Sequence, residues 1–382
     1  MLEYKETVVR DFVRTSPLYI TRPVQPDMQI FIDLCNRLNE TRVYSNFAEV
    51  EQRLSKALKT RWGSPDLLLF NNCTTALFTG MLALPRKGVI VTTPFSFPAT
   101  AHAAKLAGFD IRFCDIEPET LNIDPDAVLA TIDDDTVGVL GVHVFGNPCN
   151  VRAIGDICAF HGLYEIYDAA HCVDVFMDDR SLFHHGLFSV VSLHATKLLH
   201  CGEGGALFSR NSDFMAAVKL LMNFGIVKED VLDSVGLNGK MSEFNAAVGL
   251  SVMPRVAEEI SARACVAAQY YEGLSRVSGV SFPRFPDNLV RNHQYFPIIL
   301  SDNSNYKRDL VQLKLKEKNI HCRKYFFPLL SNCRAYKACS PRPMPTAERI
   351  ANQILCLPIH SGVTEEDINC ICAEITAVMS HG

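Results

Sequence analysis

The strongest constraint on the fold is an alternation, over the first two thirds of the chain, of short apolar runs with helix-like patterns. The runs are rich in β-branched residues and are bounded by turn residues, which is typical of buried strands. They cover residues 67–70, 89–92, 111–114, 137–142, 164–167, 189–193 and 206–209. Because strands that alternate with helices form βαβ crossovers, we expect an α/β fold whose sheet has seven mostly parallel strands.

Helix signals lie between these runs. Asp124 followed by Pro125 is typical of a helix N-cap with proline at the first helical position. Gly162 follows the helix-like residues 151–160 and is typical of the left-handed residue that ends a helix. The sequence therefore predicts the helices that parallel crossovers require.

The pattern changes near residue 255. A long helical pattern at residues 257–277 is followed by a strand-like run at 295–300 and by helix-like segments at 307–318 and 365–379. We therefore expect residues 1–255 to form a large domain and residues 256–382 to form a smaller α+β domain.

Composition excludes several functional classes. Lys and Arg number 37 and Asp and Glu number 42, which gives a formal net charge of −5. A chain this mildly acidic has no bulk attraction for nucleic acid or for an anionic membrane, so we expect neither as a partner. The longest apolar stretch, residues 137–145, is much shorter than a membrane span.

The cysteines indicate a reducing compartment. The 14 cysteines are scattered and include no C-x-x-C pair, so we expect reduced thiols and no metal site. The first residues carry acids and lack the apolar core of a signal peptide. We therefore expect a cytoplasmic protein.

Open α/β sheets bind ligands outside the carboxyl ends of their strands, so the residues after each run are candidates for function. The first run is followed by the small polar residues Asn71, Asn72, Cys73, Thr74 and Thr75. A helix that begins there would offer N–H groups and hydroxyls to an anion such as phosphate. The alternative is an ordinary N-cap without a ligand.

Three more strand ends carry reactive or aromatic side chains. Asp168 places a carboxylate after a buried strand, where it needs a cationic partner unless it is a helix N-cap. Lys197 lies beside Gly-rich turns and apolar residues that could desolvate its amine into a nucleophile, unless it is a solvated loop lysine. Phe97 could stack on a flat ring or belong to the core.

Together these four features match one cofactor, pyridoxal 5′-phosphate. This cofactor needs a phosphate cradle, a carboxylate for its ring nitrogen, an aromatic plane and an imine-forming lysine. The carboxylate keeps the ring nitrogen protonated, so that the ring can accept the electrons of a carbanion. No other common cofactor uses all four features.

Four stretches resemble successive signature blocks of the DegT/DnrJ/EryC1/StrS aminotransferases. They read TTPFSFPATAHAAKLAGF, VHVFGNPCNVRAIGDICAFHGLYEIYDAAH, SLHATKLLHCGEGGALFSR and GLNGKMSEFNAAVGL. The similarity runs in order from about Ile20 to Ile368 and so covers nearly the whole chain. The resemblance implies a fold-type-I pyridoxal-phosphate aminotransferase that acts on nucleotide-linked keto-sugars.

The resemblance also implies which residues surround the cofactor ring. Lys197 would bind the cofactor covalently and later move a proton between cofactor and substrate. Asp168 would pair with the ring nitrogen, His171 would lie near the phenolic oxygen, and Phe97 would stack on the ring.

Further residues are implied for the phosphate groups. Thr74, next to Cys73, and Ser192 would hold the cofactor phosphate, and Asn238 would reach it from the partner subunit. This last role implies a homodimer with shared active sites. Candidates for the substrate pyrophosphate, with a solvated surface as the alternative, are Lys240, Arg323, Lys324 and Tyr325.

The chain departs from the family pattern at two positions. Cys73 stands where the phosphate loop usually has glycine, and a side chain there restricts the backbone. Leu187, after Gly186, stands where many relatives have aspartate. Relatives that act as dehydratases replace the cofactor lysine with histidine, so Lys197 favours transamination.

The implied reaction takes its amino group from L-glutamate, which leaves as 2-oxoglutarate. The motifs look closest to enzymes that aminate dTDP-4-keto-6-deoxy-D-glucose at C4 to give dTDP-4-amino-4,6-dideoxy-D-glucose, a sugar expected in lipopolysaccharide O-antigen biosynthesis. The alternatives are amination at C3 of a dTDP-3-keto-6-deoxyhexose, and a catalytically idle relative that only binds the cofactor or a sugar nucleotide.

Overall fold

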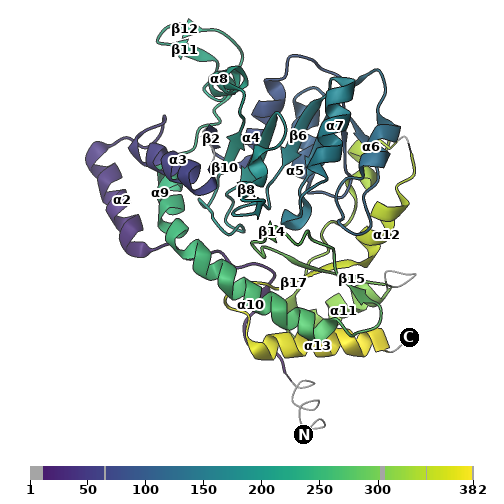
Figure 1. Ribbon diagram of the computed structural model, residues 1–382. Coiled ribbons are helices and arrows are strands. Elements are labelled where there is room, and N and C mark those ends of the chain that lie inside the picture. Colours follow the sequence, from purple (N-terminus) through teal and green to yellow (C-terminus); the bar gives the residue numbers. More distant parts are fainter. Residues whose placement is uncertain (1–11, 64–65, 302–305, 341, 381–382) are drawn as a thin grey trace.

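A seven-stranded sheet forms the centre of the molecule (Figure 1). The computed structural model describes residues 12–63, 66–301, 306–340 and 342–380. The strand order is β2-β10-β9-β6-β5-β3-β4, and β10 lies antiparallel to both of its neighbours while every other pair is parallel. The strands are β2 (Leu67–Phe70), β3 (Val89–Thr92), β4 (Asp110–Phe113), β5 (Thr136–Val142), β6 (Tyr164–Asp168), β9 (Phe188–Ser192) and β10 (Gly205–Phe208).

The sequence predictions for this sheet are confirmed. Each predicted strand is present, with its ends within one residue of the expected ones. Asp124 caps α6 (Pro125–Thr131) by accepting the N–H of Asp126, and Gly162, with φ of 64°, ends α7 (Val151–His161).

Apolar side chains alternate between the two faces of the sheet. On β3 and β5, Ile90 and Leu140 join one buried cluster, whereas Val91 and Val139 join another. This alternation follows from the two-residue period of a strand. Both faces therefore need a covering layer of helices.

Helices supply that layer on both faces. One face packs against α4 (Cys73–Leu82), α5 (Pro98–Leu106) and α8 (Ser212–Leu221). The other face packs against α6 and α7 and, under β2, β9 and β10, against α3 (Glu49–Trp62) and α9 (Glu243–Val252). α2 (Met28–Thr41) packs beside α9. The result is a three-layer α/β fold.

The C-terminal part has its own core. Its antiparallel sheet consists of β13 (Val280–Ser281), β15 (Phe296–Leu300) and β17 (Ile354–Leu357). This sheet packs with three helices, α10 (Val256–Leu274), α11 (Tyr306–Glu317) and α13 (Glu365–Ser380). A fourth helix, α12 (Pro345–Gln353), lies between the two parts of the fold. In Figure 1, α10 and α13 run side by side at the bottom of the view. The predicted C-terminal helices are confirmed, and the division near residue 255 stays a prediction.

Short strands complete the fold. β1 (Leu18–Tyr19) pairs in parallel with β16 (Ile320–His321), so the N-terminal segment joins the C-terminal core through Leu18. A second small sheet consists of β7 (Phe176–Met177), β8 (Arg180–Ser181) and β14 (Leu289–Val290). β11 (Ile226–Lys228) and β12 (Val231–Leu232) form a hairpin that stands out at the top of Figure 1.

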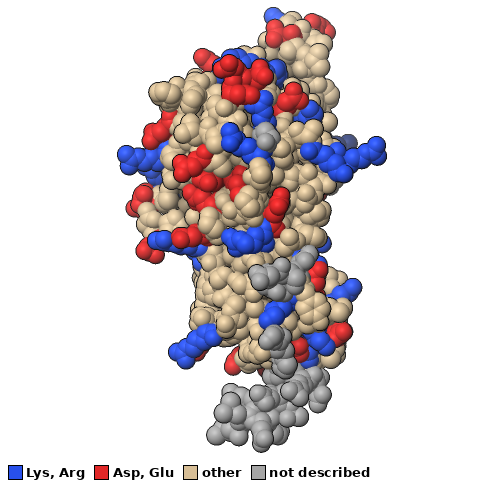
Figure 2. All heavy atoms as spheres, turned by 90° about the vertical axis from the view of Figure 1, so that its right-hand side faces the viewer, with Lys and Arg blue, Asp and Glu red and all other residues tan. Residues whose placement is uncertain are grey.

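The charged side chains are mixed on the face that Figure 2 presents. Lys and Arg lie among Asp and Glu there, and the described residues of this face form no continuous basic surface. Of the helices in the described ranges, none is both long and apolar enough to cross a membrane.

A close backbone contact ties β10 to the turn after β2. A Cβ atom at Gly205, the first residue of β10, would lie 2.5 Å from the backbone N of Cys73 and 2.6 Å from its Cα. Real Cβ atoms do not approach backbone this closely, so glycine is required for β10 to reach the start of α4.

We expect Gly205→Ala to lower the free energy of unfolding by about 1–3 kcal/mol, the usual cost of overpacking a rigid site. Gly155→Ala is a matched control, because a Cβ atom there would lie 3.5 Å from Glu165 Oε2, an ordinary contact, inside α7 where alanine favours the helix. Chemical denaturation of both variants measures the difference. Equal stability of the two variants would contradict the prediction.

Candidate active site

The predicted site residues lie at one edge of the sheet. Asp168 is the last residue of β6 and Ser192 is the last residue of β9, and the α4 turn with Cys73 follows β2. These strands run in the same direction, so their carboxyl ends meet at a common edge. The structure thus brings together Asp168, Lys197, His171 and Cys73, since the charge of Lys197 acts on each of the other three.

Asp168 is a buried carboxylate without an ion pair among the described residues. Its Oδ2 accepts the hydroxyl of Thr100 at 2.7 Å, and its Oδ1 accepts the N–H of Ala170 at 3.0 Å. Burial raises the pKa of Asp168, while these two hydrogen bonds and the positive charge of Lys197 oppose the rise. A buried carboxylate of this kind is stabilised by a cation.

His171 is a buried, neutral imidazole. Its Nδ1 accepts the N–H of Phe145 at 3.1 Å, which leaves Nε2 as the protonated nitrogen. Burial lowers the pKa of His171 well below its usual range, and the charge of Lys197 lowers it further. The neutral ring of His171 therefore has an N–H at Nε2 that is able to donate a hydrogen bond.

Lys197 lies in the connection between β9 and β10. Its Nζ donates to the hydroxyl of Tyr295 at 3.1 Å and lies 5.4 Å from the centre of that ring. Leu198 and Leu199 are fully buried and anchor the connection. The half-buried lysine therefore presents its amine from a fixed loop.

The start of α4 lies where the sequence predicts an anion cradle. Asn72 caps the helix by accepting the N–H of Thr75 at 2.8 Å, and Thr74 is exposed. Burial raises the pKa of the Cys73 thiol, with a further rise from Asp168 and an opposing effect of Lys197, so the thiol is uncharged. The cradle thus offers N–H groups and hydroxyls to an anion without a competing negative charge.

Phe97 and Ser192 occupy suitable positions for their predicted contacts. Phe97 is 59% exposed, whereas its neighbour Phe95 is fully buried, so Phe97 is not part of the core. Ser192 is buried, and its Oγ accepts the N–H of His194 at 3.4 Å. The stacking role of Phe97 and the phosphate contact of Ser192 stay predictions.

Asn238 and Lys240 lie on one loop that crosses the end of β2. The carbonyl of Asn238 accepts Asn71 Nδ2 at 3.2 Å, and the Asn238 side chain is exposed. Lys240 donates to Asn223 Oδ1 at 2.9 Å and lies 4.8 Å from the Phe224 ring. Their contacts with a phosphate stay predictions.

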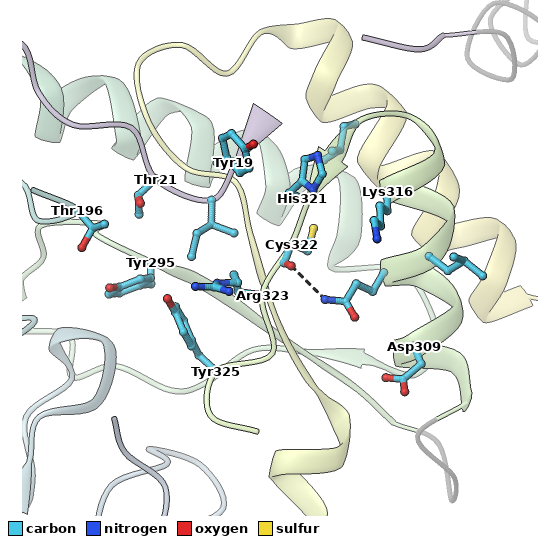
Figure 3. Close-up of a pocket in the computed structure, with 14 residues that line it drawn as sticks. Tyr19, Thr21, Thr196, Tyr295, Asp309, Lys316, His321, Cys322, Arg323 and Tyr325 are labelled. Atoms are coloured by element: carbon cyan, nitrogen blue, oxygen red, sulfur yellow. Dashed lines mark hydrogen bonds between the residues drawn. The ribbon is translucent and has the colours of Figure 1, made fainter. Parts of the chain in front are cut away.

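A cavity of about 770 Å³ opens beside Tyr295, the hydrogen-bond partner of Lys197 (Figure 3). Arg323 and Tyr325 line it, together with Thr196 and Tyr295 from the Lys197 side. Lys324 is not among the lining residues and pairs instead with Asp309 at 2.8 Å. Of the four predicted substrate contacts, the structure therefore places Arg323 and Tyr325 in the cavity wall.

Sequence reasoning missed Tyr295 and Thr100. Tyr295 packs edge-on against His171 with ring centres 4.8 Å apart and contacts Lys197, yet no motif surrounds it in the sequence. Thr100 lies one helical turn after Phe97, at a spacing that places both on one side of α5. This spacing from Phe97 is the sequence signal that could have identified Thr100.

Both departures from the family pattern are compatible with a working site. Cys73 is the first residue of α4 and is absent from the residues with positive φ, so its backbone does not require glycine. Leu187 directly precedes β9, at the opposite edge of the sheet from Ser192. A carboxylate at position 187, where many relatives have aspartate, would therefore lie away from Lys197.

The residues present fit pyridoxal phosphate. The buried Asp168 carboxylate suits the ring nitrogen, and the α4 cradle suits the phosphate. The exposed face of Phe97 and the amine of Lys197 complete the set of groups that this cofactor needs.

Comparison with known proteins supports this interpretation. A model of the DegT/DnrJ/EryC1/StrS aminotransferase family matches residues 28–376. The dTDP-4-amino-4,6-dideoxy-D-glucose transaminase of Shigella dysenteriae is 36% identical over 366 residues, which cover 95% of this chain and 99% of the relative. The enzyme of the same name from Escherichia coli is 35% identical over 354 residues, which cover 91% of this chain and 95% of the relative.

A solved structure is similar along the same length. The crystal structure of DesI in the presence of its TDP-sugar product superimposes with a TM-score of 0.92 at 30% identity, covering 97% of this chain and 95% of that chain.

We expect Asp168→Asn to raise the melting temperature of the cofactor-free protein at pH 7 by a few degrees, because the change removes a buried charge. The pKa of Asp168 is raised in the folded protein, so its charge destabilises the fold only above the pKa of the unfolded chain. The gain in melting temperature should therefore vanish below about pH 4.

In the same variant, the affinity for the cofactor should fall about tenfold to a hundredfold, which corresponds to the loss of a charged hydrogen bond. Scanning calorimetry and cofactor titration measure both effects, and unchanged affinity would contradict the assignment.

Proposed function

Because the chain belongs to the DegT/DnrJ/EryC1/StrS family of pyridoxal-phosphate aminotransferases, we propose that it transfers an amino group from L-glutamate to a nucleotide-linked keto-deoxysugar. The proposed substrate is dTDP-4-keto-6-deoxy-D-glucose, and the proposed product is dTDP-4-amino-4,6-dideoxy-D-glucose. The names of the two relatives from Shigella dysenteriae and Escherichia coli support this choice. The TDP-sugar product with which DesI was crystallised supports a TDP-linked substrate.

The observation that carries the proposal is the cavity beside Lys197. Thr196 and Tyr295 place its inner end next to the lysine amine, and Arg323 contributes a guanidinium to its wall. Within the described ranges Arg323 forms no ion pair, so its charge is available to an anion. In a keto-sugar linked to a diphosphate, the keto group would react next to the Lys197 amine and the diphosphate would lie near the guanidinium of Arg323.

The residues of this chain have separate tasks in the proposed reaction. Pyridoxal phosphate, when bound, supplies an electron-accepting ring that stabilises negative charge on the reacting carbon. Lys197 would take the proton from the α-carbon of glutamate, whose carbon skeleton leaves as 2-oxoglutarate with an oxygen from water while the amino group is retained in the site. Lys197 would then deliver a proton to the sugar carbon that receives this amino group and gives up its keto oxygen as water. Asp168 keeps the ring nitrogen protonated, and His171 donates a hydrogen bond from a neutral ring.

The chain also offers a surface suited to a homodimer with shared active sites. The β11–β12 hairpin and the residues after it expose apolar side chains, with Val227 58%, Leu232 71% and Val235 93% exposed. Such an exposed apolar patch is typical of an interface. Asn238 lies three residues beyond Val235, so this interface would bring it to the partner subunit.

We propose a cytoplasmic location on the basis of the thiols. All 14 cysteines of the sequence are free in the structure, as is usual in a reducing compartment. The division into residues 1–255 and 256–382 and the place in O-antigen biosynthesis stay predictions.

The function is tested with L-glutamate and a panel of dTDP-, UDP- and GDP-linked 3-keto and 4-keto sugars. We expect 2-oxoglutarate and the C4-aminated sugar from dTDP-4-keto-6-deoxy-D-glucose, identified by mass and NMR. Lys197→Ala should lower the rate at least about a hundredfold, because general acid–base catalysis contributes about 10²–10⁴-fold. An aminated product from the 3-keto sugar would favour C3 amination. If no sugar of the panel led to 2-oxoglutarate, the catalytically idle relative would be favoured.

Shared active sites are tested by mixing two inactive variants. In a mixed dimer of Lys197→Ala and Asn238→Ala, one site would combine both changes while the other would combine the intact Lys197 and the intact Asn238. We therefore expect activity to return after subunit exchange. The control is a mixture of Lys197→Ala with Asp168→Asn, which changes two residues of the same chain's site and should stay inactive.

A further inference from the structure

We propose that the stacked side chains of Tyr19 and His321 are the platform for the nucleobase of the substrate. The inference rests on the proposed function, since it assigns the outer end of the same cavity to the nucleotide of the keto-sugar. Both residues line the same cavity as Thr196, the neighbour of Lys197 in the chain, and Tyr295, whose hydroxyl accepts a hydrogen bond from Lys197.

The platform is built by pairing of two distant segments. β1 and β16 are parallel strands whose register places Tyr19 opposite His321. Paired positions on neighbouring strands place their side chains on the same face, and the two rings stack with centres 5.0 Å apart and planes 29° apart. Leu18 anchors the pair in the C-terminal core, while Tyr19 remains 57% exposed.

Neighbouring contacts fix the orientation of His321. Its Nε2 lies 3.2 Å from Asn319 Oδ1, within hydrogen-bond distance. Gln312 of α11 donates to the carbonyl of Cys322 at 3.1 Å, the dashed line in Figure 3, and so ties the helix to the residue that follows β16. The imidazole of His321 is therefore oriented by its neighbours, and the ring of Tyr19 stacks on it.

The position of the pair in the cavity matches the order of groups in a nucleotide sugar. In Figure 3, Thr196 and Tyr295 lie on the left, Arg323 lies beside Tyr295 and below Tyr19, and His321 and Lys316 lie farther to the right. A sugar that reacts at Lys197 would place its diphosphate near Arg323. The base then reaches the aromatic pair.

The charges along the cavity suit a diphosphate. Lys316 and Arg323 line it and form no ion pair with the residues that the structure describes. Asp309, the acidic residue that lines the cavity, is already paired with Lys324 at 2.8 Å and with Arg308 at 2.7 Å. The cavity as a whole therefore has a positively charged lining, with Arg323 nearer to Tyr295 and Lys316 nearer to His321.

The test is the binding of thymidine diphosphate to the holoenzyme, measured by titration calorimetry. We expect Tyr19→Ala and His321→Ala to weaken binding about tenfold, which corresponds to about 1.4 kcal/mol and lies within the range for stacking of one base. Tyr19→Phe retains the ring and should bind as the wild type does. Phe160→Ala is the matched control, because it removes an exposed aromatic ring from α7, outside the cavity.

Steady-state kinetics separates the platform from a general defect. Tyr19→Ala should raise the KM for the nucleotide sugar about tenfold and leave kcat and the KM for glutamate unchanged, because glutamate has no base. Wild-type affinity of both alanine variants for thymidine diphosphate would overturn the platform, even if the enzyme aminates its sugar. A wild-type protein that aminates no sugar nucleotide would instead overturn the proposed function, whereas loss of thymidine diphosphate binding in the variants would still support the platform.

Discussion

The parallel register of β5, β6 and β9 is the constraint on which the candidate site depends. It pairs Val142 with Asp168 and Asp168 with Val190, so that the carboxylate emerges where the neighbouring strands also end. Lys197 follows β9 at the same edge, and Gly205 brings the returning strand against the start of α4. The cofactor groups are thus far apart in sequence but adjacent in space because the strands share one direction. A shift of register by one residue would turn Asp168 to the opposite face.

The fold keeps charges at this edge that it does not neutralise internally. The hydroxyl of Thr100 and the N–H of Ala170 satisfy the oxygens of Asp168, but burial still raises the pKa of its carboxyl. Lys197 opposes that rise and also helps to keep His171 neutral. The protein would be more stable if apolar side chains replaced these charged groups. Their cost is typical of a site whose stability is completed by a ligand.

Local signals made the sheet, and the strand ends at which the candidate cofactor residues lie, predictable from the sequence. Strand runs, the Asp124 cap and the Gly162 helix end each depend on a few neighbouring residues, and the structure confirms them. The sequence could not decide whether Phe97 belongs to the core, because Phe95 and Phe97 both follow the same strand. Burial of Phe95 and exposure of Phe97 settle that choice. Tyr295 escaped prediction, since its contact with Lys197 exists only after the C-terminal core has packed against the sheet.

The substrate end of the site illustrates the limit of local signals most clearly. β1 and β16 are two residues long, so neither has a periodicity that a sequence pattern could reveal. Their pairing nevertheless sets Tyr19 against His321 and closes the cavity that Arg323 lines. The residues proposed to contact the cofactor come from strand ends of one sheet, whereas the residues of this cavity are brought together by long-range pairing between the N-terminal segment and the C-terminal core. The sequence therefore reveals the chemistry of this site more readily than the identity of the sugar nucleotide that it accepts.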